Sequence, residues 1–383
     1  MAIQTQVIDA TALLNARSEI EKSRQAKELL AVPASALAAG KVVAFPTETV
    51  YGLGANIHCP EAVDQIFTLK GRPNDNPLIV HVGQKEAIFP LVSDYPKAAE
   101  VLVQDLMPGP LTLVLPRSKI VPDNVTAGLD TVGIRLPNHD VTRYLLKLAA
   151  VPVAAPSANL SGKPSPTLAE HVVHDLKGAL KYVVDGGPCK VGVESTVLDL
   201  SAGPPLILRP GGVTAATILT CLVGHGITFS QPNWQQQLLQ SGTGHSVVDA
   251  DVPKSPGMKY RHYAPEGTVK LIAGSNVRTC TADVLQKVET LGNKHSVYGI
   301  FANQELISDV RQQWPSEKQL IAYSYGPNAD INLATHELFA GLRFLDERKA
   351  EFILVETFPD RGMGTAYMNR LIKAAGGTPL EIE

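Results

Sequence analysis

Two cations, Lys70 and Arg72, are separated by a single glycine at the end of a stretch that is predicted to be an amphipathic helix. One interpretation is a helix C-terminus, where cations meet the negative end of the helix dipole and glycine makes the turn. The other is a phosphate site, because arginine binds phosphate bidentately and lysine supplies a point charge. A proline forces the chain out of the helix here, and Asn76 and His81 add polar groups soon afterwards. These features favour the phosphate site.

A third cation, Arg135, ends the segment TVGIR at residues 131–135, which is predicted to be an apolar strand. A cation in a mostly buried strand requires a partner, which is either an internal carboxylate or an anionic ligand. Because Pro137 ends the strand and places Arg135 near its open end, we favour a ligand carboxylate or phosphate.

Short polar side chains gather at other strand ends. In the segment PTETVYGLG at residues 46–54, an apolar strand breaks at Pro46 into a turn of hydroxyls and one acid, and two glycines follow the turn. The segments APSANLSG at 155–162 and GVESTV at 192–197 border further strands, and Arg209 ends another. Each is an ordinary turn when taken alone. Taken together they favour a pocket for a phosphorylated ligand, because exposed backbone N–H groups form anion sites and ligands bind at strand ends.

Composition limits the class of protein. The chain has 383 residues, 44% of them apolar and 19% charged, which indicates a globular protein with two domains. A net charge of −3 argues against a nucleic-acid coat protein. The four cysteines form no CxxC pair and no His/Asp/Cys cluster has metal spacing, so neither a disulfide framework nor a structural zinc site is expected. The sequence shows no signal peptide and no apolar run that could span a bilayer.

We expect four parts: an N-terminal extension at 1–34, a catalytic domain at 35–228, a linker or lid at 229–267 and a C-terminal domain at 268–383. The extension should hold an edge element and a charged helix from Arg17 to Leu30. In the catalytic domain, strands are expected over Val42–Phe45, Leu78–His81, Leu111–Pro116, Thr131–Leu136, Val151–Ala155, Tyr182–Asp185, Ser195–Asp199 and Leu206–Arg209. In the C-terminal domain, strands are expected over Val269–Ala273, Val297–Phe301, Gln319–Tyr323 and Phe352–Glu356. Alternation with helices predicts an α/β fold with a sizeable mixed sheet, followed by a small parallel sheet.

The segment after Phe229 is polar, rich in glycine and proline, and without hydrophobic period, so regular structure is not expected there. Residues 255–265 are nevertheless dense in aromatic and basic side chains, Tyr263 among them. They form either a passive tether or a lid over the pocket.

The ordered motifs PTETVYGLG, KGRP, NPL followed by histidine, GIRLP, APSANLSG, ESTV and RPGG resemble those of the YrdC-like threonylcarbamoyl-adenylate synthases. Together with residues 257–265 and the C-terminal part, they resemble the longer, two-domain form. The resemblance implies a twisted mixed sheet with a concave, positively lined cavity and a small Rossmann-like domain. It also implies the synthesis of L-threonylcarbamoyl-AMP from L-threonine, bicarbonate and ATP, with pyrophosphate release, for the modification of adenosine 37 in transfer RNA.

The resemblance also implies the site residues. Lys70 and Arg72 are the expected catalytic pair, and the expected L-threonine site is formed by Thr49, His81, Arg135, Ala155 and Ser195. The expected ATP site is formed by Arg72, Asn76, Thr131, Ser157, Asn159, Ser165, Arg209 and Tyr263. Mg²⁺ would arrive with ATP and bridge its phosphates, no protein metal site is expected, and the product would pass to the tRNA-modifying transferase machinery, with RNA contact possible, in the cytoplasm.

Two other functions fit the same fold module. A non-catalytic module that binds double-stranded RNA is disfavoured by the negative net charge and the small polar pocket residues. A carbamoyl-transfer enzyme of the hydrogenase-maturation type is disfavoured because the CxxC pairs of its zinc-finger segments are missing.

Overall fold

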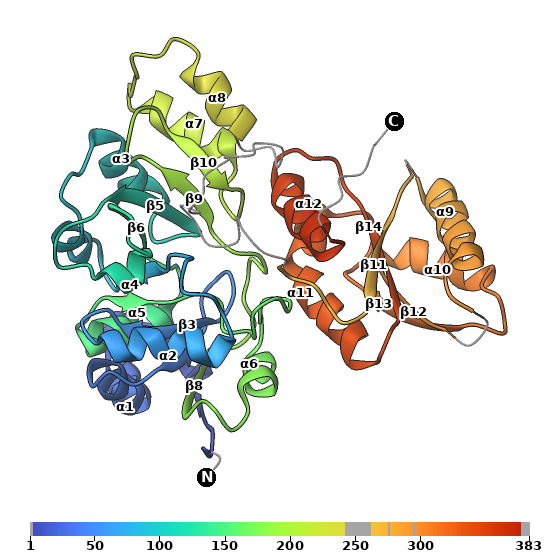
Figure 1. Ribbon diagram of the computed structural model, residues 1–383, viewed down its shortest axis with the longest axis horizontal. Helices are drawn as coiled ribbons and strands as arrows, with labels where there is room; N and C mark the ends of the chain where they lie inside the picture. Colours follow the sequence, from blue (N-terminus) through green and yellow to red (C-terminus); the bar gives the residue numbers. More distant parts are fainter. Residues whose placement is uncertain (1–2, 242–261, 275, 294–295, 377–383) are drawn as a thin grey trace. The chain divides into compact units, whose positions relative to one another are not determined.

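The computed structural model describes residues 3–241, 262–274, 276–293 and 296–376 (Figure 1). These residues form two compact units. The first contains residues 3–161 and 165–241, and the second contains residues 162–164 together with those from 262 onward. Among the residues described, no helix combines the length and the apolar character needed to cross a bilayer.

The first unit is built on a ten-stranded sheet in the order β1-β8-β2-β3-β7-β4-β6-β5-β9-β10, with both parallel and antiparallel neighbours. The predicted large mixed sheet is therefore confirmed. Its strands are β1 (Gln6–Asp9), β2 (Val43–Phe45), β3 (Gly52–Asn56), β4 (Ile79–His81), β5 (Leu111–Pro116), β6 (Thr131–Arg135), β7 (Val153–Ala154), β8 (Tyr182–Asp185), β9 (Thr196–Asp199) and β10 (Leu206–Arg209). Its α-helices are α1 (Glu19–Ala38), α2 (Pro60–Lys70), α3 (Lys97–Leu106), α4 (Asp123–Thr126), α5 (Asp140–Ala149), α6 (Ala169–Leu176), α7 (Ala215–Gly224) and α8 (Trp234–Ser241). The 3-10 helices are η1 (Thr11–Asn15) and η2 (Lys85–Leu91).

The two faces of this sheet are covered differently. Successive strand residues point to opposite faces, so Val80 and Ile134 join the core that contains apolar residues of α2 and α3. On the opposite face, Phe45 and Val153 join a second core, to which α1 and α5 contribute. Farther along that face, over β4, β5, β9 and β10, a cluster around Ile79 consists of strand side chains. Several polar residues belong to these four strands or directly precede them: His81, Thr112, Ser195 and Arg209.

Three local predictions were wrong. The first helix runs to Ala38, beyond the expected end at Leu30, and continues through Pro33. The glycine-rich segment after the polar turn forms strand β3, where a Cβ on Gly54 would lie 2.4 Å from the Phe45 ring and 2.7 Å from Val153. The glycine is therefore required because the Phe45 ring lies across the strand.

The third error concerns the segment after Phe229, where no regular structure was expected. Helix α8 occupies Trp234–Ser241 and buries Trp234 and Leu238 in the core of the first unit. Two apolar anchors one helical turn apart are enough to fix this otherwise polar helix. Residues 242–261 lie outside the described part of the chain.

The second unit has a four-stranded, all-parallel sheet in the order β11-β14-β12-β13. Its elements are β11 (Thr268–Ile272), α9 (Val277–Thr290), β12 (Val297–Ala302), α10 (Gln304–Gln312), β13 (Gln319–Ser324), α11 (Ile331–Glu347), β14 (Phe352–Glu356) and α12 (Met363–Ala374). The prediction of a small parallel α/β domain is confirmed.

Candidate functional site

The polar turn between β2 and β3 is fixed by its own hydroxyl groups. Thr47 Oγ1 donates to the Val50 carbonyl at 2.6 Å and accepts from the Thr49 amide at 3.1 Å. The two threonine hydroxyls are also 2.8 Å apart, and both side chains are buried. These bonds provide partners for polar backbone groups of the turn. They also fix the backbone on both sides of Glu48, which is buried between the two threonines.

Glu48 forms a buried ion pair with Arg135. Its Oε2 lies 2.8 Å from Arg135 Nη2, and the two side chains are only 6% and 5% exposed. The sequence favoured a ligand over an internal carboxylate as the partner of Arg135. The structure shows that an internal carboxylate is present, and a ligand contact in addition to it stays a prediction. Glu48 Oε1 and Arg135 Nε are also buried, and neither makes a hydrogen bond within the described residues. Buried polar groups normally have partners, so these two atoms retain binding capacity.

His81 lies beside Arg135, because β4 and β6 pair in parallel with these two residues in register. The pKa of His81 is lowered to about 3, first by burial and second by the positive charge of Arg135. Its Nδ1 donates to the Ile79 carbonyl at 3.1 Å, and its ring meets Phe45 edge-on at 6.1 Å. A neutral imidazole with its proton on Nδ1 leaves Nε2 as a hydrogen-bond acceptor.

Two further groups near this ion pair escaped the sequence analysis. His139 precedes α5, and its pKa is lowered by burial, against the opposing charge of Glu48. Burial also raises the pKa of the Cys189 thiol, which keeps it protonated near Glu48 and Arg135. The sequence carried a signal for Glu48, which is the one acid in a turn of hydroxyls, but none for His139 or Cys189.

Lys70 joins the end of α2 to the loop after β7. Its Nζ donates to the carbonyls of Ser157 at 2.6 Å and Asn159 at 2.5 Å. Ser157 Oγ in turn donates to Asn159 Oδ1 at 2.5 Å. Gly71 does make the left-handed turn that ends the helix, with φ of 59°, but the Lys70 ammonium reaches this loop. Folding thus brings Lys70 into contact with Ser157 and Asn159, which lie 87 and 89 positions later in the chain.

The loop that follows is braced by Arg72, whose Nη2 donates to the carbonyls of Asn76 at 3.3 Å and Pro77 at 3.2 Å. The Asn76 side chain is 1% exposed, and neither of its amide atoms makes a hydrogen bond within the described residues. An amide that is buried without a partner costs free energy, so this position also retains capacity for a ligand or a water.

A third cluster surrounds Ser195. Its hydroxyl lies 2.8 Å from the Thr112 hydroxyl, and its carbonyl accepts from Arg209 Nε at 3.2 Å and Nη2 at 3.0 Å. Next to it, Ser165 Oγ donates to Glu194 Oε1 at 2.5 Å. The RPGG motif approaches this backbone so closely that a Cβ on Gly211 would lie 2.3 Å from the Ser195 carbonyl carbon. That contact explains why glycine is needed there.

A narrow cavity lies on the strand face, next to the third cluster. Thr131, Thr112, Gly133, Ile79 and Val197 line it. Its connection to the third cluster runs through Thr112, which bonds Ser195. Ala155 contributes through its backbone, since its N–H donates to the Ile79 carbonyl at 2.9 Å.

Tyr263 belongs to the second unit and is 5% exposed. Its ring stacks on Phe339 with a centroid distance of 5.2 Å, and the Arg370 guanidinium lies 5.7 Å from its centre. Its backbone is left-handed, with φ of 65°. Residues 255–261 of the lid hypothesis lie outside the described residues, so the lid and the contact of Tyr263 with a nucleotide stay predictions.

Comparisons with known proteins identify both parts of the chain. The Sua5_yciO_yrdC family model, described as telomere recombination, matches residues 35–211. A model described as the C-terminal domain of threonylcarbamoyl-AMP synthase matches residues 213–376.

Curated relatives and solved structures agree over nearly the full length. A threonylcarbamoyl-AMP synthase of Pyrococcus abyssi is 40% identical over 96% of this chain and 98% of its own length. One of Bacillus subtilis is 42% identical over 91% and 93%. The crystal structure of P. abyssi Sua5 complexed with L-threonine matches with a TM-score of 0.78 and 36% identity, covering 97% of this chain and 98% of that one.

Proposed function

The chain belongs to the Sua5/YciO/YrdC family and is a nucleotidyltransferase-type enzyme, and on this premise we propose that it makes L-threonylcarbamoyl-AMP from L-threonine, bicarbonate and ATP. The reaction releases pyrophosphate. The observation that carries the proposal is a set of buried polar atoms on Glu48, Arg135 and Asn76 that make no hydrogen bond within the described part of the chain. These atoms lie in the motifs assigned to the two substrates.

The buried pair suits an amino acid. A zwitterion offers a carboxylate to the unused donor of Arg135 and polar hydrogens to the unused acceptor of Glu48. His81 is neutral and therefore adds no charge that would oppose this arrangement. Thr49, Ala155 and Ser195 complete the proposed threonine site, and the relative of known structure that binds L-threonine supports it.

The ATP side is proposed around two of the clusters described above. Lys70 and Arg72 would stabilise the charge that develops on the departing pyrophosphate, with Lys70 exchanging a loop carbonyl for a phosphate oxygen. The remaining proposed ATP contacts are Asn76, Thr131, Ser157, Asn159, Ser165, Arg209 and Tyr263. ATP would enter as its Mg²⁺ complex, in which the ion would supply positive charge to the phosphates and would need few protein ligands.

The chemistry proceeds in two steps. The threonine amine first combines with bicarbonate to give a carbamate, with loss of water. A carbamate oxygen then attacks the α-phosphorus of ATP, the bond to the bridging oxygen breaks, and pyrophosphate leaves. No acyl-enzyme forms, so positioning and charge neutralisation carry the reaction. The buried thiol of Cys189, whose pKa is raised by burial, is suited to packing and not to nucleophilic attack.

The product is a mixed anhydride that is activated for transfer of the threonylcarbamoyl group. We propose that it serves the modification of adenosine 37 in transfer RNA, in the cytoplasm, where the four free cysteines would stay reduced.

Pyrophosphate release tests this function. We expect release from ATP that depends on both threonine and bicarbonate. Release without threonine would contradict the assignment. Tight binding of double-stranded RNA with no threonine-dependent release would instead favour the non-catalytic RNA-binding alternative.

A further inference from the structure

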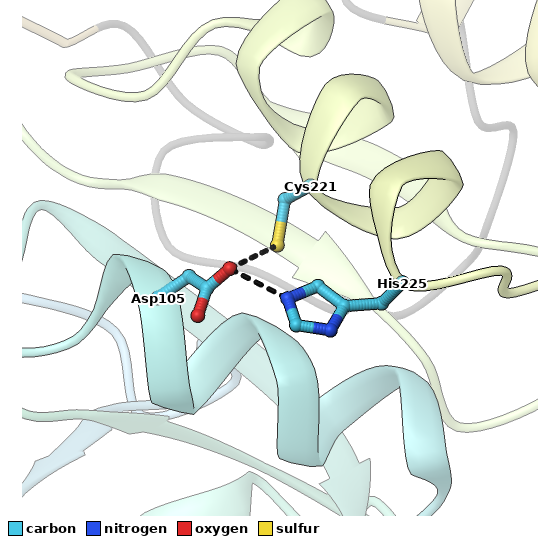
Figure 2. Close-up of side chains that lie close together, drawn as sticks. All are labelled: Asp105, Cys221 and His225. Carbon is cyan, nitrogen blue, oxygen red and sulfur yellow. Dashed lines mark hydrogen bonds and ion pairs between the residues drawn. The ribbon is translucent and has the colours of Figure 1, made fainter.

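Three potential metal ligands meet between α3 and α7 of the first unit (Figure 2). Cys221 and His225 are four residues apart and so lie on the same face of α7 and its C-terminal cap, while Asp105 comes from α3. Asp105 Oδ2 lies 2.7 Å from His225 Nε2 and 3.7 Å from Cys221 Sγ. One ligand atom from each residue lies within 4.8 Å of the other two.

The order of these groups does not suit a cysteine nucleophile. In Figure 2 the carboxylate bonds both the thiol and the imidazole, whereas an activated thiol needs the imidazole as its immediate neighbour. A thiol held in this way needs a cation to become a thiolate at neutral pH.

We propose that Asp105, Cys221 and His225 form a binding site for a thiophilic divalent cation of the Zn²⁺ class, separate from the substrate site. Zinc takes one thiolate, one imidazole and one carboxylate at bond lengths of about 2.3, 2.0 and 2.0 Å in a tetrahedron. Those bonds place sulfur and oxygen about 3.5 Å apart, and nitrogen and oxygen about 3.3 Å apart. The observed distances of 3.7 and 2.7 Å therefore require only small side-chain shifts.

Binding releases the thiol proton to solvent and leaves the imidazole neutral, with its proton on Nδ1. Because Asp105 and His225 are exposed, a water molecule can occupy the fourth position. At present hydrogen bonds connect Asp105 on α3 with Cys221 and His225. The ion would replace them with coordinate bonds and would so stabilise the packing of α7 on α3. Lys85 opposes binding, because its positive charge acts on Asp105. Its Nζ, however, is held by the Gln104 carbonyl at 3.1 Å.

Such a site was not expected from the sequence, because Asp105 is 116 residues from Cys221 and only folding brings them together. The ligand set also separates this site from the Mg²⁺ that accompanies ATP. A thiolate and an imidazole select Zn²⁺ or Co²⁺, whereas Mg²⁺ prefers oxygen ligands.

Cobalt spectroscopy tests the proposal on the full chain, purified without an affinity tag and treated with a chelator. We expect one equivalent of Co²⁺ to produce the thiolate charge-transfer band and the strong visible bands of a tetrahedral site, and Zn²⁺ but not Mg²⁺ to abolish them. Cys221→Ser should remove the charge-transfer band, and His225→Gln or Asp105→Asn should weaken binding by roughly a hundredfold. Cys59→Ser, which changes another half-buried free cysteine, is the matched control and should leave the spectrum unchanged.

A second measurement does not depend on colour. Saturating Zn²⁺ should raise the Tm of the first unit by roughly 5 to 10 °C, and this shift should be absent in Cys221→Ser. The proposal is overturned if the Co²⁺ spectrum shows no thiolate band, or if Cys221→Ser and the wild type bind the metal equally well while both are folded by circular dichroism. Either result would leave the three residues as a hydrogen-bonded contact only.

Discussion

The Glu48–Arg135 pair predicts that stability and threonine binding can be separated by a double-mutant cycle. Both partners are at least 94% buried in an ion pair of 2.8 Å, so removing either charge leaves the other buried without a counter-ion. We therefore expect Arg135→Met or Glu48→Gln alone to lower the free energy of unfolding by about 3 to 5 kcal/mol. The double variant, which buries no charge at this position, should recover most of that loss.

Threonine affinity should behave differently. A charge-assisted hydrogen bond to a ligand carboxylate contributes about 1.5 to 3 kcal/mol. Arg135→Met should therefore weaken threonine binding by roughly ten- to a hundredfold, and the stable double variant should stay equally weak.

The chain allows the unfolding of the first unit to be followed on its own. Of its two tryptophans, Trp234 is buried in the first unit and Trp314 belongs to the second. In a Trp314→Phe background, fluorescence during urea unfolding reports the first unit, and calorimetric titration gives threonine affinity. A double variant that binds threonine as tightly as the wild type would show that Arg135 has a structural role only.

Three further outcomes are expected. Lys70→Ala should lower ATP turnover roughly a hundredfold while threonine affinity changes less than about twofold, and unchanged turnover in a folded variant would show that Lys70 only orders the loop at Ser157. Gly211→Ala should destabilise the first unit by about 3 kcal/mol, because its Cβ would lie 2.3 Å from the Ser195 backbone. The control is Gly224→Ala, whose Cβ would meet nothing within 4 Å and which should be neutral or stabilising in the same unfolding assay. The folded-state pKa of His81, about 3, lies below its usual value near 6.5, so the unfolded chain binds the extra proton and stability falls as pH drops below 6.5. Relative to His81→Gln, the wild type should lose about 2 kcal/mol between pH 7 and pH 5, and parallel pH profiles of the two would contradict a buried neutral imidazole.

Much of the fold could be predicted from the sequence because its strands are short apolar runs bounded by proline, glycine and hydroxyl residues. β5, for example, was predicted with its observed bounds, Leu111–Pro116. β3 was missed because its glycines suggest a turn, and only the Phe45 ring that crosses them shows why a strand needs them. α8 was missed because most of its residues are polar, and its two apolar anchors become meaningful only against the core they enter.

For the candidate site, the sequence identified the residue types and strand ends but not the partners. Lys70 was expected at a phosphate or at a helix end. It contacts Ser157, which lies 87 residues later in the chain, and the sequence gives no sign of a contact over such a separation. Arg135 was expected to pair with a ligand, and Glu48 was noted only as one acid in a turn. The sequence did not indicate that these two residues form an ion pair. Pairing across such separations is set by the order of strands in the sheet, which periodicity does not encode.

The most direct test of the central claim follows the carbon of bicarbonate. The enzyme is mixed with ATP, Mg²⁺, L-threonine and isotopically labelled bicarbonate, and the nucleotide products are separated at once and analysed by mass spectrometry. We expect an adenylate that carries both threonine and the labelled carbon and that forms together with pyrophosphate. It should be lost when either threonine or bicarbonate is omitted, or when Arg135 is replaced in the stable double variant. Release of pyrophosphate without a labelled, threonine-containing adenylate would contradict the proposed function.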